Sequence, residues 1–128
     1  MDARATAVLR KSRSIRTLAT PMPTRALLVV TTLGSASDAR TFVRSLVEDH
    51  LIACGTLLPG AVSIYRWEGA LMEEEEVVVL LKTDQSKWSA LAAAVKERHP
   101  YQVPELLALP VDRGLDVYLS WLTSEVVG

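Results

Sequence analysis

Two side chains of this sequence are suited to bind a soft or borderline metal ion, and both lie beside breaks in regular structure. His99 opens the run HPYQVP at 99–104, in which Pro100 disfavours helical dihedral angles at the histidine and Pro104 removes a backbone donor. Cys54 is the only thiol of the chain. Because imidazole and thiolate both ligate copper and zinc, His99 and Cys54 are the candidate metal ligands.

Both residues also have a structural interpretation, which we favour. The apolar stripe of the helical segment before His99 reaches this residue when it is extended by one turn, which predicts a partly buried imidazole bonded to a neighbouring backbone group. Cys54 opens an extended run, and unactivated thiols behave as small hydrophobic side chains. A catalytic pair would need His50 or His99 within hydrogen-bond reach of the thiol, and a third group to orient the base.

A second group of residues could line a ligand cleft between subunits. It combines aromatic side chains with one lysine: Tyr65, Trp67, Lys82, Tyr101 and Trp121. Aromatic walls and one cation would suit a small anionic ligand, and packing at a subunit interface explains the same residues equally well. The four glutamates at 73–76 alternate sides on an extended chain, so we interpret them as solvated hairpin charge.

The composition indicates one acidic domain behind a basic N-terminal segment. Residues 1–25 hold six basic side chains and one acidic one, whereas residues 26–128 hold eight basic and fourteen acidic ones. This domain is a poor match for a phosphate backbone, so we expect no nucleic-acid binding. One cysteine excludes an internal disulfide, and no apolar run approaches the roughly 20 residues of a membrane span.

We interpret residues 1–25 as a basic, disordered extension and residues 26–128 as the folded domain. Residues 1–22 are rich in Ala, Arg, Ser and Thr, a composition that overlaps with organelle transit peptides. An unstructured tail, or a start codon placed upstream of Met22, is the interpretation we favour. We therefore expect a cytoplasmic protein, with organelle targeting as the less favoured alternative.

The apolar patterns predict the element order β-α-β-β-α-β followed by a short helix. The expected strands are at 26–32, at 53–67 with a kink at 59–60, at 77–82 and at 105–109; the expected helices are at about 37–50, at 86–98 and from 116. Ser37 and Asp38 are the expected cap of the first helix. This order fits an α+β ferredoxin-like split βαβ sandwich.

The positions of the prolines predict the order of the strands in the antiparallel sheet of this fold. The two proline-free apolar runs should be central and the two proline-marked strands should lie at the edges, which gives the strand order 4-1-3-2. The helices would then cover one face only. Since Tyr65, Trp67 and the Val/Leu runs supply apolar groups for two faces, we expect the other face to be buried against copies of the chain, with help from the last helix.

Several ordered motifs resemble those of the CutA divalent-cation tolerance proteins. They span Leu27 to Leu122 and read LIAC at 51–54, LPG at 58–60, SIYRWEG at 63–69, LKT at 81–83, HPYQVPE at 99–105 and YLSWL at 118–122. The resemblance implies a ferredoxin-like subunit in a tight homotrimer, similar in architecture to the PII signalling proteins. It also implies a role in tolerance of copper and other divalent cations.

The resemblance carries over only part of a copper site. Some members of the family are described as copper binders through a cysteine at the end of the first strand and two histidines before Pro-Tyr. Here Thr31 and Arg98 replace two of these residues and only His99 matches, so we expect weak binding of copper or another divalent cation. We predict a non-enzymatic trimer that senses or buffers a metal ion or small molecule. The alternative is a small-molecule enzyme that uses His99 and Lys82 in intersubunit clefts.

Overall fold

The computed structural model of the protein describes residues 24–127. In chain order its elements are β2 (Ala26–Leu33), α2 (Ala36–Glu48), β3 (Cys54–Trp67), β4 (Ala70–Asp84), the single 3-10 turn η2 (Gln85–Lys87), α3 (Trp88–Arg98), β5 (Leu107–Pro110) and α4 (Asp116–Val126). Our expectations for residues 1–23 lie outside the described part. Thr24 and Arg25, which we assigned to the extension, are already tied to the domain through Val111 and Asp84.

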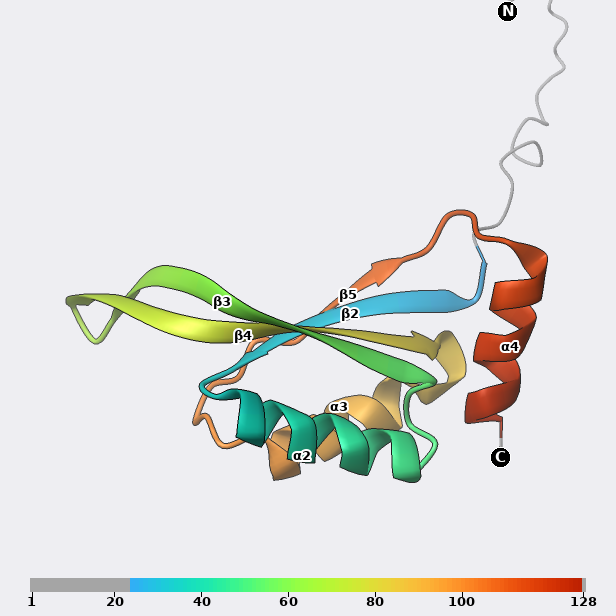
Figure 1. The fold of residues 1–128 in the computed structure, drawn as a ribbon, viewed down its shortest axis with the longest axis horizontal. Helices are drawn as coiled ribbons and strands as arrows, with labels where there is room; N and C mark the ends of the chain where they lie inside the picture. The colour runs from blue at the N-terminus through green and yellow to red at the C-terminus, as the bar shows by residue number, and fades with distance from the viewer. Residues whose placement is uncertain (1–23, 128) are drawn as a thin grey trace, which may run out of the picture.

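The sheet is four-stranded and antiparallel, in the order β3-β4-β2-β5. With the strands counted along the chain this is the predicted order 4-1-3-2, so the ferredoxin-like α+β fold is confirmed. In Figure 1, α2 and α3 lie together beneath one face of the sheet. The hairpin of β3 and β4 projects beyond the helices at the left, and α4 lies at the opposite end.

The hydrophobic core lies between the sheet and the helices α2 and α3. Alternate residues of the central strands point into it, and the helices contribute their apolar stripes: Leu27, Val29, Leu33, Val77, Val79, Leu81, Phe42, Leu46, Leu91 and Val95. Gly55 allows α2 to approach β3 closely, because a Cβ atom there would lie 2.6 Å from Cγ1 of Val43. The core therefore occupies the helix-facing side of the sheet and leaves the opposite side of each strand outside it.

Several predicted boundaries differ from the observed ones, most of them by one or two residues. The cap of α2 is Ser35, whose hydroxyl accepts from the backbone N–H of Asp38 at 3.1 Å, so the helix begins before the predicted cap. The strand expected at 77–82 extends over Ala70–Asp84, because the glutamates at 73–76 continue the ladder with β3. The expected helix at 86–98 begins as the turn η2. The last strand is Leu107–Pro110 rather than 105–109, and its proline is tolerated at the sheet edge.

A β-bulge at Pro59 and Gly60 divides β3 into two halves, as the kink in the sequence predicted. Leu58 pairs with Val78, but the next pair is Ala61 with Glu76. Three residue steps on β3 therefore oppose two steps on β4, which inverts the facing of every later β3 residue. Gly60 adopts φ +86°, a conformation that favours glycine.

The sheet face opposite α2 and α3 carries exposed apolar side chains. Leu58, Leu107 and Leu109 are 47%, 59% and 48% exposed there. Helix α4 covers only the end of this face, through the small cluster of Ala26, Ala53, Leu122 and Val126. We call this surface the open sheet face.

Candidate functional site

His99 ends α3 and is buried, with 7% of its surface exposed. Its Nε2 lies 2.7 Å from the carbonyl oxygen of Thr32, and its Nδ1 lies 3.1 Å from the backbone nitrogen of Tyr101. Since the N–H of Tyr101 is a donor and the carbonyl of Thr32 is an acceptor, the neutral tautomer with hydrogen on Nε2 satisfies both contacts. The predicted hydrogen bond to backbone is therefore present. A metal ion could bind either nitrogen only after one of these bonds breaks.

The two residues that replace copper ligands in the resemblance have structural surroundings. Thr31 is fully buried on the helix-facing side of β2, and its hydroxyl has no partner among residues 24–127. Arg98 joins α3 to α2, with Nη2 donating to Asp49 at 2.6 Å and Nη1 donating to Ser45 at 3.3 Å. Neither side chain adds a metal ligand beside His99.

Cys54 and Lys82 lie opposite each other at the far end of the β3-β4 pair. The sulfur of Cys54 is 3.8 Å from the hydroxyl of Tyr118 on α4, and the ammonium of Lys82 donates to Thr56 at 2.8 Å. Burial and then the thiol contact raise the pKa of Tyr118. The Tyr118 ring in turn lies 5.7 Å from that of Trp121.

His99 and Lys82 are not brought together within one chain. Lys82 pairs with Leu28 on β2, four residues before Thr32, which His99 contacts. Four residues of strand span about 13 Å. The two residues of the enzymatic alternative therefore belong to separate ends of the sheet.

A cavity of about 780 Å³ lies where the projecting hairpin leaves the four-stranded part of the sheet, and we call it the hairpin cavity. It gathers three of the five predicted cleft residues, Tyr65, Trp67 and Tyr101. Lys82 and Trp121 are absent from its lining. The remaining lining residues come from the end of β2, the hairpin and the loop after α3: Thr32, Ser63, Ile64, Met72, Glu74, Glu76, Gln102, Val103 and Glu105.

Two glutamates of the hairpin, Glu74 and Glu76, line this cavity. Our interpretation of 73–76 as solvated charge holds for the exposed residues 73–75 and is wrong for Glu76, which is buried. The hydroxyl of Tyr65 donates to Glu74 at 2.6 Å, and that of Tyr101 donates to Glu76 at 2.7 Å. Glu76 is only 7% exposed. Sequence reasoning missed both residues because it did not follow the inverted facing past the bulge, which places Ser63 and Tyr65 on the side of Glu74 and Glu76.

The pKa values of both cavity tyrosines are raised. The hydrogen bond to Glu74 raises the pKa of Tyr65 above 10.0. Burial and the hydrogen bond to Glu76 raise the pKa of Tyr101 more strongly. The cation expected to bind an anionic ligand is missing from this cavity, because none of its lining residues is Lys or Arg.

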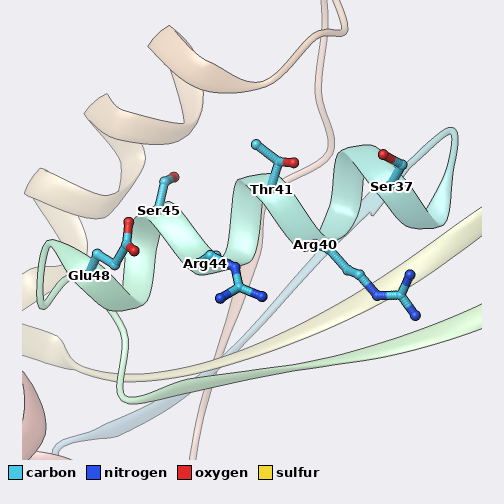
Figure 2. A pocket seen from close by; sticks show the side chains of 6 residues that line it. All are labelled: Ser37, Arg40, Thr41, Arg44, Ser45 and Glu48. Carbon is cyan, nitrogen blue, oxygen red and sulfur yellow. The ribbon is translucent and has the colours of Figure 1, made fainter.

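A second, smaller hollow of about 430 Å³ lies along the outer side of α2. Figure 2 shows its lining, in which Arg40 and Arg44 extend to one side of the helix and Ser37, Thr41 and Ser45 point to the other. All of its lining residues come from this one helix, and it holds no predicted site residue.

The described residues offer no ready metal centre. Nowhere in residues 24–127 do three His, Cys, Asp or Glu side chains converge on one point. The same part of the chain contains no helix long and apolar enough to cross a membrane.

The ferredoxin-like fold, the long hairpin and the His-Pro-Tyr joint are those of a small α+β protein of the kind that the sequence resembles. Residues 27–125 match the family described as "CutA1 divalent ion tolerance protein", and the chain belongs to that family. The "Divalent-cation tolerance protein CutA" of Citrobacter koseri is 46% identical over 101 residues, covering 79% of this chain and 88% of that protein.

Solved structures give the same result. The crystal structure of CutA from Xylella fastidiosa superposes with a TM-score of 0.78 at 37% identity, covering 80% of this chain and 99% of that one. The divalent cation tolerance protein of Thermus thermophilus superposes with a TM-score of 0.75 at 42% identity, covering 78% of this chain and 97% of that one. The family resemblance seen in the sequence is thereby confirmed.

Proposed function

We propose that the protein acts in tolerance of divalent cations as a non-enzymatic homotrimer that binds or senses a metal ion or a small ligand in the cytoplasm. The observation that carries the ligand-binding part is the hairpin cavity, which brings Tyr101 of the loop after α3 together with Tyr65 and Trp67 of β3. Family membership over residues 27–125 supports the connection with cation tolerance.

The open sheet face supports self-association. Its exposed leucines form an apolar surface that lies outside the core of the single chain, and α4 adds the partly exposed rings of Tyr118 and Trp121 beside it. Burial of such a surface against copies of the same chain favours a closed, symmetric oligomer. Light scattering on the full chain at micromolar concentration should give the mass of a trimer. A stable monomer or dimer would refute this part of the proposal.

Direct metal binding by one chain should be weak. Both nitrogens of His99 are engaged by backbone groups, and Cys54 lies with Tyr118 at another part of the sheet. We expect Cu(II) titrations to give weak binding that changes little in His99→Ala or Cys54→Ser. Native mass spectrometry of the purified oligomer would report bound ions and stoichiometry together. One tight ion per subunit, lost in His99→Ala, would restore a metal site at His99 to first place.

The enzymatic alternative has less support. Neither histidine of the described chain contacts the thiol of Cys54, since His50 lies 3.0 Å from the carbonyl oxygen of Glu125 and His99 bonds Thr32 and Tyr101. Within residues 24–127, the thiol of Cys54 therefore has no histidine within hydrogen-bond reach that could act as its base.

A further inference from the structure

The open sheet face carries opposite charges at its two ends. Glu74 and Glu76 point to this face at the hairpin end, where both line the hairpin cavity. Lys82 points to it at the other end, and by alternation it is the one basic side chain that the four strands direct to this face. Asp84 also falls on this side of β4, but Arg25 already pairs with it.

These charges remain unpaired within one chain. Lys82 and Glu76 are six residues apart on β4, which is about 20 Å along the strand. None of the ion pairs that the structure shows between residues 24 and 127 includes Glu74, Glu76 or Lys82. The ammonium of Lys82 instead donates to the hydroxyl of Thr56, and Glu76 accepts from the hydroxyl of Tyr101.

Burial of the open sheet face against another copy makes the orientation of the two copies matter. The exposed leucines between the charged ends provide the apolar area that drives such burial. A charge that is buried without an opposite charge is costly. Two faces that met with like ends together would place carboxylates against carboxylates. A head-to-tail contact instead brings Lys82 of one copy to Glu76 of the next, and contacts of this kind close into a ring, as the proposed trimer requires.

We propose that Lys82 of one copy enters the hairpin cavity of the next copy and forms an ion pair with Glu76 and Glu74 there. The cavity volume of about 780 Å³ is large enough to admit a lysine side chain, and its aromatic rings attract an ammonium group. This inference rests on the proposed function, because it names the contact that orients the copies in the trimer. The cleft that the sequence predicts between subunits is then assembled from two copies.

Zero-length cross-linking of the full chain in its native assembly tests this contact directly. A water-soluble carbodiimide joins an amine to a carboxylate only where the two groups touch, and the separation of about 20 Å excludes a link inside one chain. We expect an amide between Lys82 and Glu76 or Glu74, identified by mass spectrometry of the digested protein. The linked product should migrate as two or more joined chains in a denaturing gel.

Charge variants measure the strength of the contact. Lys82→Arg keeps the charge and removes the reactive amine, so the assembly should persist while the link disappears. Lys82→Glu or Glu76→Lys alone should lower the association constant of the copies at least about tenfold, as measured by light scattering on dilution in a fixed guanidinium concentration. The double variant restores opposite charges and should regain most of this loss. Glu75→Lys is the matched control, because Glu75 pairs with Val62 and points to the other side of the hairpin; it should change the constant less than about twofold.

Three results would overturn the pairing and leave the trimer in place. They are a trimer without the cross-link at Lys82, a double variant that associates no better than the single ones, and equal losses in Glu75→Lys and Glu76→Lys. A stable monomer would refute the trimer and the pairing together. A dimer that carries the cross-link between Lys82 and Glu76 would support the pairing and reject the trimer.

Discussion

Replacing His99 with alanine tests whether this residue is a structural joint. The side chain connects the end of α3 to the end of β2 and to the loop after α3, through Thr32 and Tyr101. Its ring also packs edge-on against Phe42 and Tyr101, with ring centroids 5.4 Å and 4.7 Å away. Alanine removes both hydrogen bonds and most of the packing.

The size of the effect follows from these contacts. Two lost hydrogen bonds cost about 1 kcal/mol each, and the lost ring contacts add about 1 kcal/mol. We therefore expect His99→Ala to lower the free energy of unfolding by about 3 kcal/mol. His50→Asn is the matched control, because His50 is exposed at φ 57° and asparagine tolerates that conformation. It should cost less than about 1 kcal/mol.

Guanidinium unfolding followed by far-UV circular dichroism measures the difference. All proteins should be compared at one concentration, because assembly adds to apparent stability. The titration is repeated with a chelator present. A loss below about 1 kcal/mol in His99→Ala, or one equal to that of His50→Asn, would refute the structural role. If the chelator alone reproduced the loss in the wild-type protein, a bound metal rather than the backbone bonds would be responsible.

Three further predictions concern packing and titration. Gly55→Ala should destabilise the fold by about 1–3 kcal/mol because its Cβ would collide with Val43, whereas Gly34→Ala, whose nearest neighbour would be 3.5 Å away, should be nearly neutral in the same unfolding assay. All three tyrosines of the sequence have a raised pKa, so tyrosinate absorbance should appear at higher pH in the folded protein than in guanidinium; any tyrosine that ionises below about pH 10 when folded would contradict this. Burial opposes ionisation of Asp84, but the hydrogen bonds from Ser86 and the charge of Arg25 outweigh it and lower its pKa. Its contribution is therefore present above the unfolded pKa of about 3.9 and is lost as the pH falls through the lower folded pKa, so the stability gap between wild type and Asp84→Asn should narrow as the pH falls below about 4; a gap that stays unchanged down to about pH 2 would refute the assignment.

The order of the sheet was predictable because prolines carry a physical constraint that does not depend on context. A proline cannot donate to a ladder, so Pro59 and Pro110 place their strands at the edges. The burial of His99 was predictable for a similar reason, since the stripe of α3 continues through it. Boundaries were harder, because the ladder of a hairpin extends through charged residues such as Glu73 and Glu75 once the opposite strand is in place.

The composition of the cavity could not be read from alternation alone. If side chains alternated between the two faces of β3 without interruption from Cys54 onward, Tyr65 and Trp67 would lie on the helix-facing side, away from Glu74 and Glu76. The extra residue at the bulge moves both rings to the side of these two glutamates. Tyr101 then closes the site from a loop whose path is set by the hydrogen bonds of His99. The joint at His99 and the bulge at Gly60 thus determine together that the aromatic rings meet carboxylates rather than Lys82.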